Sequence, residues 1–327
     1  MFGRILLKSL KWLGISLAVL LLVSVTYEQI VRWQLERKLE DQQLTYADVN
    51  SHQVHYVKKG EGPFTIVFES GLGGDHTIWK EIQDRLSKQA TTLSYDRSGL
   101  FLSEASNLPV DNQTISDELF LLLEKTNCPK PYIVVTHSMG GIYLRPFITE
   151  HKEDICGVVF VDCSHPQQFK RSTEKMLRAV QAPSPAMVKL LVATGIYRIM
   201  FSFMPFSPEI PMSHPFHAQQ KTYFYKSIDK TFEESEAVNA NFADAEQYTS
   251  FNDLPLTVIM GTSPTRYAGL GDTSVQAEFS NLWEVLQTDL LQLSRNSKLV
   301  KASNSGHMVQ ISEPGLIVSA VEEIVKR

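Results

Sequence analysis

The sequence predicts an α/β fold, in which a mostly parallel central sheet carries helices on both faces. Short apolar runs rich in β-branched residues, at 65–69, 132–136 and 256–261, are typical of buried parallel strands. Glycine-rich turns follow the first two runs, and stretches of mixed apolar and polar residues, typical of helices, come after the second. The 327 residues are 43% hydrophobic and carry a net charge of -5, which suits one large α/β domain with an accessory segment.

The N-terminal segment 1–27 differs in composition from the rest of the chain. Arg4, Lys8 and Lys11 precede an uncharged, apolar stretch from Trp12 to Tyr27. A stretch that is apolar all round is typical of a membrane span rather than of a helix packed on a soluble domain. A cleaved signal peptide is the alternative, but no A-x-A-like cleavage pattern ends the stretch. Positive flanks stay in the cytoplasm. We therefore expect a single-pass anchor in the lipid bilayer of the cell membrane, with the rest of the chain outside the cytoplasm.

Three further parts are expected after the anchor. Residues 28–45 are charged and glutamine-rich with helical spacing, as in a linker or stalk. The core is expected at 46–165 and 253–327. The segment 166–252 between them has no strand pattern, and we interpret it as a helical cap whose apolar residues favour a hydrophobic substrate. Its helix-like stretches are 172–181, 187–203 and 232–248.

The pentapeptide THSMG at 136–140 directly follows a strand-like run. It is one residue away from the G-x-S-x-G pattern, in which a serine on a sharp strand-to-helix turn exposes its hydroxyl above a parallel sheet. Small residues are needed on both sides of that turn. Gly140 and Gly141 meet this need after the serine, whereas Thr136 departs from glycine before it. The pattern predicts that Ser138 is a nucleophile; a serine that only caps the next helix is the alternative.

Two more features fit a serine nucleophile. The run 65–69 leads into a glycine-rich loop at 70–74, the kind of loop that supplies one backbone N–H to an oxyanion hole. The residue after the nucleophile supplies the other, so we expect Leu72 and Met139 to be the oxyanion donors. His307 lies late in the chain, after a candidate strand at 298–302, where the order serine, acid, histidine requires the general base.

Two motifs link these features to a known family. Residues 94–99 read SYDRSG, and His307 follows a glycine. With them, the chain from about Tyr46 to its C-terminus resembles the α/β-hydrolase superfamily, whose D-x-R-G-x-G turn and histidine loop they match. The resemblance implies an α/β-hydrolase fold with a cap insertion and a triad of serine, acid and histidine, as in esterases and lipases. We interpret Asp96 and Arg97 as an ion pair that braces the turn.

The triad acid departs from the usual pattern of the family. The family usually carries it just after the strand before the histidine strand, but no carboxylate directly follows 256–261. Some lipase-like members take the acid from the end of the preceding strand instead, and Asp162, after the run 158–161, matches that layout. We therefore predict Asp162 as the acid. Asp272 is the leading alternative, because a long loop could fold it back toward His307, and Asp289 is a third.

The residues together predict hydrolysis of a moderately apolar, small-molecule ester through an acyl-enzyme, with His307 moving the serine proton. Acyl transfer, amide cleavage and carbon–carbon bond hydrolysis use the same groups and remain alternatives, as does a non-catalytic ligand receptor that keeps the fold. The serine argues against dehalogenase or epoxide hydrolase chemistry, because those members of the resembled family use an aspartate at the elbow.

Composition excludes several other classes. Lysine and arginine are dispersed and the net charge is -5, which opposes nucleic-acid binding. His52 and His55 lie three apart in a probable strand, on opposite faces, and His214 with His217 has no third ligand nearby, so no metal site is expected. No cofactor motif is present, and the three cysteines are too few for a disulfide framework.

Overall fold

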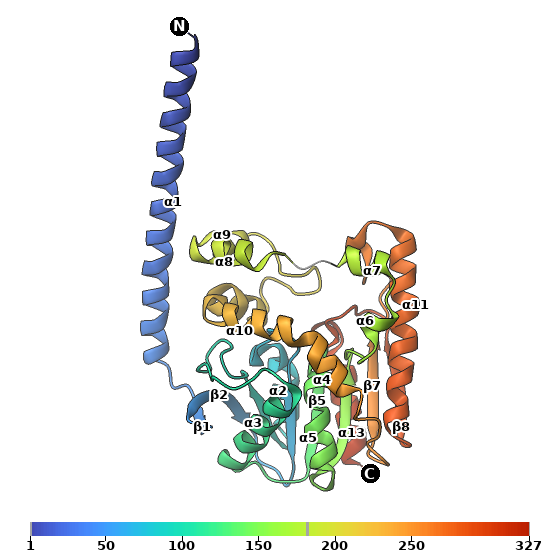
Figure 1. Cartoon of the computed structure of the whole chain (residues 1–327). Coiled ribbons are helices and arrows are strands. Elements are labelled where there is room, and N and C mark those ends of the chain that lie inside the picture. The colour runs from blue at the N-terminus through green and yellow to red at the C-terminus, as the bar shows by residue number, and fades with distance from the viewer. Residues whose placement is uncertain (1, 181–182, 327) are drawn as a thin grey trace. The chain divides into compact units, whose positions relative to one another are not determined.

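The computed structural model describes residues 2–180 and 183–326, and its centre is an eight-stranded sheet (Figure 1). The strands lie in the order β1-β2-β4-β3-β5-β6-β7-β8. Their bounds are β1 Tyr46–Val49, β2 His52–Lys59, β3 Thr65–Glu69, β4 Thr91–Tyr95, β5 Tyr132–His137, β6 Ile155–Val161, β7 Leu256–Gly261 and β8 Ser297–Ala302. β1 and β2 pair antiparallel, β2 pairs antiparallel with β4, and the other pairs are parallel. The predicted fold class is confirmed.

Helices cover both faces of the sheet. Successive side chains of a strand point to opposite faces. On β6, a Cβ on Gly157 would lie 2.6 Å from Ile324 of α13, whereas the next residue, Val158, packs in one cluster with Leu119 and Phe147. Leu119 lies on α3 and Phe147 on α5, so α13 and the pair α3 and α5 lie on different faces. The helices of this core are α2 Lys80–Leu86, α3 Asn112–Lys125, α4 Gly140–Tyr143, α5 Arg145–Glu150, α11 Thr273–Asp289, α12 Val309–Ser312 and α13 Pro314–Val325.

Short 3₁₀ turns join several of these elements, and five helices follow β6. The turns are η1 His76–Trp79, η2 Lys152–Asp154, η3 Ala268–Leu270 and η4 Leu290–Leu293. The five helices are α6 Gln168–Arg171, α7 Glu174–Ala179, α8 Pro185–Ala193, α9 Ile196–Met200 and α10 Pro215–Ala245. Gln181, at the end of one predicted helical stretch, lies outside the described residues. The stretch 187–203 is interrupted at Gly195, whose φ of 73° ends α8 and starts α9.

α10 is longer than the helical stretch expected at 232–248. His214 caps it by accepting a hydrogen bond from the N–H of Phe216, and Pro215 occupies its first turn. The helix therefore begins 17 residues before the expected start.

The described residues form two compact units. One unit joins 2–44 with 183–206, and the other joins 45–180 with 207–326. The predicted boundary between stalk and core, at 45/46, falls next to this division. The predicted cap at 166–252 is shared between the two units, so its role as a cap stays a prediction.

α1, Phe2–Glu40, is a single helix that runs through the expected anchor and most of the expected stalk. Its segment Leu6–Glu40 is long and apolar enough to cross a membrane, with a mean hydropathy of 1.9 in an 18-residue window.

The strand order marks the place of the site. β3 has β4 on one side and β5 on the other, so the chain reverses its winding direction between β3 and β5. In open α/β sheets, ligands bind beyond the carboxyl ends of the strands at such a switch point. The loops that leave β3, β5 and β6 meet there.

Candidate active site

Ser138 lies on a sharp turn between β5 and α4. Its φ is 53°, a left-handed conformation that costs a non-glycine residue energy and that clusters at functional sites. The carbonyl of Ser138 accepts hydrogen bonds from Gly141 N at 3.2 Å and Ser164 N at 2.9 Å, which hold the turn. Thr136 fits where glycine is usual because its hydroxyl lies 3.1 Å from Sγ of Cys163 in the buried interior. The threonine is therefore accommodated at this turn.

The glycine-rich loop after β3 lies against this turn. A Cβ on Gly71 would lie 2.9 Å from the Cβ of Ser138, so only glycine lets the loop approach so closely. Among the described residues, no acceptor takes the backbone N–H of Leu72 or of Met139. The two predicted oxyanion donors thus lie on the loops that meet at Ser138, and each has a free N–H. Their role in catalysis stays a prediction.

Arg97 holds the glycine-rich loop in place. Its guanidinium donates to the carbonyl oxygens of Ser70 and Gly71, both at 2.8 Å, and is only 5% exposed. It also pairs with the buried carboxylates of Glu69 and Glu234. Glu234 in turn accepts from the N–H of Gly73 at 2.8 Å. The expected ion pair between neighbours 96 and 97 is wrong, because each side chain finds partners elsewhere; Arg97 instead orients the backbone that carries Leu72.

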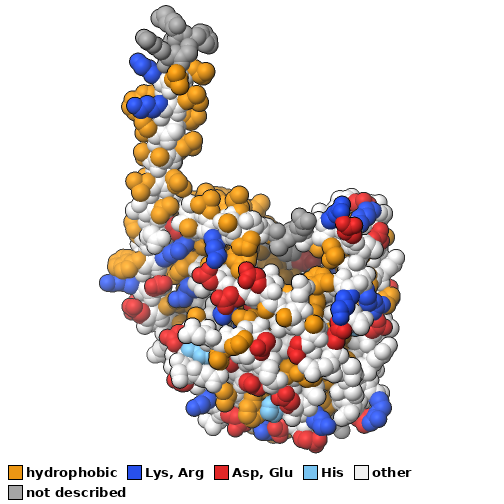
Figure 2. Space-filling view, viewed as in Figure 1, with side chains coloured by type: hydrophobic (Ala, Val, Ile, Leu, Met, Phe, Trp, Pro, Cys, Tyr) orange, Lys and Arg blue, Asp and Glu red, His pale blue; other side chains and the backbone are white. Residues whose placement is uncertain are grey.

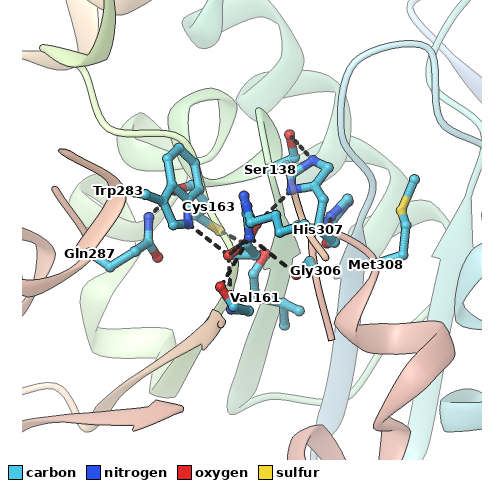
Figure 3. A network of polar contacts seen from close by, with 12 residues as sticks. Ser138, Val161, Cys163, Trp283, Gln287, Gly306, His307 and Met308 are labelled. Atoms are coloured by element: carbon cyan, nitrogen blue, oxygen red, sulfur yellow. Dashed lines mark hydrogen bonds and ion pairs between the residues drawn. The ribbon is translucent and has the colours of Figure 1, made fainter. Parts of the chain in front are cut away.

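His307 lies in the loop between β8 and α12, and hydrogen bonds to its backbone and its ring fix it. Its backbone N–H donates to Glu209 at 3.1 Å, and the next N–H, of Met308, donates to the same carboxylate at 2.9 Å. Its carbonyl accepts from Nε2 of His137 at 2.9 Å. Burial, followed by the nearby His307, lowers the pKa of His137 to about 3, so His137 stays neutral. The ring of His307 then bridges Asp162 and Ser138 (Figure 3).

Asp162 is fully buried at the end of β6, with φ 47°. Its Oδ2 lies 2.6 Å from Nδ1 of His307, and its Oδ1 accepts from the N–H of Gly261 at 3.0 Å. Burial works to raise the pKa of Asp162, but the charge of Arg266 and the hydrogen bond and charge of His307 outweigh it and hold that pKa well below its ordinary value. The carboxylate is therefore ionised at neutral pH.

The structure places the two alternative acids elsewhere. Asp272 caps α11 by accepting from the N–H groups of Ser274 and Val275. Asp289 pairs with Arg171 at 2.6 Å. Of the three candidates, Asp162 alone has a hydrogen bond to His307 among the described residues. Gly261 helps to make this possible, because a Cβ there would lie 1.6 Å from the carbonyl oxygen of Gly306, next to the histidine.

Two partners of Asp162 were not found by sequence reasoning. Arg266, in the loop after β7, contacts Oδ1 at 2.8 Å through Nη1 and Oδ2 at 2.6 Å through Nη2. Trp283 of α11 donates its indole N–H to Oδ1 at 2.8 Å, and its ring lies 4.7 Å from the guanidinium carbon (Figure 3). The loop after β7, where the family usually carries the acid, thus supplies an arginine instead. The sequence signal for this pair was a carboxylate directly after the β6 run together with a basic residue in the loop after the β7 run.

The protonation state of the site follows from these contacts. An ionised carboxylate can only accept hydrogen bonds, so the proton shared with Asp162 belongs to Nδ1 of His307. Nε2 is then unprotonated and accepts from the hydroxyl of Ser138, 3.1 Å away. In this arrangement His307 is the base that can take the serine proton, and Asp162 fixes its tautomer.

A cavity of about 330 Å³ opens beside Ser138 and His307. Most of its wall is apolar or aromatic, and it lies wholly within one unit of the chain. The lining apolar residues are Phe169, Leu177, Val180, Tyr267, Phe279, Leu282, Trp283 and Leu286. His76 and His137 do not line it.

His55, His76 and Asp96 form a separate cluster, whose potential ligand atoms lie within 4.8 Å of one another. Nδ1 of His55 lies 3.2 Å and Nδ1 of His76 2.9 Å from the carboxylate. Burial opposes protonation of His76, but the charge of Asp96 and its hydrogen bond prevail and raise the pKa of His76. The buried carboxylate therefore favours the protonated, positively charged form of His76. The cluster is thus explained as hydrogen bonds that hold the 94–99 turn.

Comparisons of this chain with known proteins point to one family. A model of the alpha/beta hydrolase family matches residues 66–320. An AB hydrolase superfamily protein of Gibberella zeae is 27% identical over 281 residues, which cover 80% of this chain and 85% of that protein. The haloalkane dehalogenase DatA of Agrobacterium tumefaciens C58 has a TM-score of 0.62 at 14% identity, with 87% and 96% of the two chains covered. A thermophilic esterase from Thermogutta terrifontis has a TM-score of 0.57 at 15% identity, with 87% and 98% covered. These two likenesses show the fold alone. The chain belongs to the alpha/beta hydrolase family.

Proposed function

We propose that this protein is a serine hydrolase that cleaves carboxylic esters through an acyl-enzyme. The observation that carries the proposal is the unbroken chain from Asp162 through His307 to Ser138, with contacts of 2.6 and 3.1 Å. Nothing in this chain of contacts requires a cofactor: the serine attacks, the imidazole moves a proton and the carboxylate stays charged.

The reaction would proceed in two halves. Ser138 Oγ attacks the ester carbonyl carbon while its proton moves to Nε2 of His307, and the carbonyl oxygen becomes an oxyanion between the N–H groups of Leu72 and Met139. Collapse of this intermediate releases the alcohol, which takes the proton from Nε2 and leaves an acyl group on Ser138. Water, deprotonated by Nε2, then attacks the acyl carbon. The acid leaves, and the proton returns to Ser138.

The apolar cavity of about 330 Å³ supports a substrate with a moderately large hydrophobic group. This volume is at the lower end of the range for small-molecule sites, which argues for a medium acyl or alcohol group rather than a macromolecule. The serine supports ester cleavage over the chemistry in the name of the dehalogenase that shares the fold.

Anchoring in a bilayer is part of the proposal. The apolar stretch of α1 supports it by length and composition, and the cations Lys8 and Lys11 at its start favour a cytoplasmic N-terminus with the hydrolase unit outside. Carbonate extraction of membranes from expressing cells is expected to leave the protein in the membrane fraction. Release of a soluble form shortened near Thr26 would contradict the anchor.

The ester activity is tested with p-nitrophenyl esters of increasing acyl length and purified full-length protein. We expect hydrolysis with a kcat/KM that rises from acetate to a medium chain and then falls as the cavity is filled. Ser138→Ala is the control and is expected to lower the rate at least about 10³-fold. If folded wild-type protein is no faster than folded Ser138→Ala across the whole series, the proposed activity is contradicted. The alternative of a ligand receptor without catalysis would then be favoured.

A further inference from the structure

The α8–α9 hairpin belongs to the same compact unit as α1, not to the hydrolase core. The hydroxyl of Ser24 donates to the carbonyl of Thr194 at 2.5 Å. Arg32 donates to the carbonyl of Val192 at 2.6 Å. Both acceptors lie at the end of α8, in the turn that leads to α9. The hairpin is therefore bonded to α1 between residues 24 and 32, where the apolar stretch of α1 ends.

A buried carboxylate sets the position of the hairpin. Glu28 of α1 is only 2% exposed and accepts from Nε of Arg198 at 3.0 Å and from Nε of Arg32 at 2.9 Å. Gly195 makes the turn with φ 73°, and a Cβ there would lie 3.1 Å from Glu28. A buried ion pair is sensitive to geometry, since displacing either partner leaves a charge without compensation. The hairpin is thus fixed at one level of α1.

Most of the exposed side chains of the hairpin are apolar. Phe203, three residues after the end of α9, is 83% exposed, and further exposed apolar side chains lie on both helices and next to Phe203. They are Met187 at 55%, Leu190 at 55%, Ile196 at 43%, Ile199 at 52% and Met204 at 46%. The segment 183–206 contains two charged residues, Lys189 and Arg198, and the second is paired with Glu28. In Figure 2, hydrophobic side chains gather along α1 and over α8 and α9.

This surface continues the exposed apolar surface of α1. Leu20, Val23 and Tyr27 of α1 are 64%, 60% and 60% exposed, and the hairpin joins the helix beside the last of them. Large contiguous apolar surfaces of this kind mark sites for proteins or membranes. A helix that spans a bilayer already brings lipid to this level, so lipid is the partner that the geometry provides. Short helices with an apolar face are suited to the boundary between headgroups and acyl chains.

We propose that the α8–α9 hairpin lies in the interface of the bilayer, with the side chains of Met187, Leu190, Ile199 and Phe203 inserted among the lipids beside α1. The inference rests on the proposed membrane anchor. It adds a second point of membrane attachment that is 160 residues away in the sequence from the first.

The test uses an environment-sensitive NBD label on single cysteines of the full-length protein in phosphatidylcholine vesicles. Cys156 is changed to serine, because Cys128 and Cys163 are buried and Cys156 is not. Labels go on Phe203→Cys and Met187→Cys. Leu20→Cys, in the apolar part of α1, reports the anchor. Asp41→Cys is the matched polar control, because Asp41 is exposed and lies just after α1, about 20 Å beyond Glu28 along the helix axis. Lipids with a nitroxide at carbon 5 of the acyl chain quench labels that reach the interface.

We expect blue-shifted emission and at least threefold stronger lipid quenching at positions 187 and 203 than at 41. If position 20 is quenched while 187 and 203 behave like 41, the hairpin inference fails and the anchor stands. If 187 and 203 are shielded from aqueous iodide without lipid quenching, a protein surface such as a second copy covers them, and the inference fails as well. No quenching at 20 would overturn the anchor and the inference together, whereas the ester activity is decided separately by Ser138→Ala.

Discussion

The turns after β5 and β6 present their functional side chains with nearly the same backbone conformation, but they are built in different ways. Ser138 has φ 53° and Asp162 has φ 47°. The serine turn is held by Gly141 and by the glycine-rich loop, whose sequence can be recognised. The carboxylate of Asp162 is held by groups 99 to 145 residues away, on β7, the loop after it, α11 and the histidine loop. The proposed nucleophile can thus be predicted from local sequence, whereas the proposed acid depends on tertiary contacts.

The largest effect is expected at the acid itself. Asp162→Asn removes the charge that fixes the His307 tautomer, so kcat for a p-nitrophenyl ester should fall about 10⁴-fold with little change in KM. Asp272→Asn is the matched control, because that side chain caps α11 and pairs with Lys175 at the surface, and it should leave kcat within about twofold. A loss in Asp272→Asn with near-normal Asp162→Asn would reverse the assignment.

The glycine-rich loop that lies against the turn of Ser138 depends on Arg97. Replacing Arg97 is expected to lower the free energy of unfolding. Arg97→Met leaves Glu69 and Glu234 buried without their cation, which is expected to destabilise the fold by about 3–5 kcal/mol. Urea unfolding in detergent would measure this difference. Arg295→Met, which breaks an exposed pair with Asp253, serves as the control and should change little. Equal effects of the two variants would show that Arg97 does not brace the loop.

The contributions of His137 and Asp162 to folding stability should be lost over different pH ranges. The pKa of His137 is lowered to about 3 by burial, while an unfolded histidine titrates near 6.5. The unfolded chain therefore binds a proton that the folded chain does not, and stability falls as pH drops from about 6.5 to 3, by up to about 1.4 kcal/mol per pH unit. The pKa of Asp162 is lowered, so its stabilisation persists above pH 4 and is lost only as pH falls through its folded value.

His137→Gln isolates this contribution, because a glutamine amide can still donate to the carbonyl of His307. Relative to wild type, the variant should lose less unfolding free energy between pH 6.5 and 4.5 in urea titrations. Parallel pH dependences of the two proteins would show that His137 is not the group responsible.

The smallest effect is expected at Arg266. Each charged hydrogen bond contributes about 1.5–3 kcal/mol, so Arg266→Gln should lower kcat roughly 10- to 100-fold if these bonds orient Asp162. Without the cation the pKa of Asp162 rises, and the acid limb of the kcat/KM profile should move to higher pH. Arg266→Lys keeps the charge but not the two-point contact, so it should restore the limb more than the rate. A lower rate with an unmoved profile in both variants would limit Arg266 to a structural role.

Much of the core was accessible from sequence because its signals are local. The runs at 65–69, 132–136 and 256–261 are strands, since β-branched residues buried on both faces produce unbroken apolar runs. Ser138 and His307 were placed by motif and order. β1, whose exposed and buried residues alternate over only four positions, gives too short a pattern to detect.

Other parts could not be predicted because they depend on contacts between distant segments. A basic residue in the loop after β7 was the available signal for a partner of Asp162, but the two residues are 104 positions apart and only the tertiary fold brings them together. The hairpin at 185–200 falls within the segment expected to be a cap, and nothing in the sequence indicates its bonds to Ser24 and Arg32 of α1. Likewise, nothing near Glu28 in the sequence points to its partner Arg198, 170 residues away.

The proposal that Ser138 is the nucleophile is tested most directly by peptide mapping. The full-length protein reacts with a fluorophosphonate, and mass spectrometry then locates the adduct. A stable phosphonyl adduct forms only on a serine activated by a base, so its position identifies the nucleophile. We expect one adduct, on the peptide that contains Ser138, formed much more slowly in Asp162→Asn and absent in Ser138→Ala. A folded wild type without an adduct, or with its adduct on another serine, would contradict the proposal.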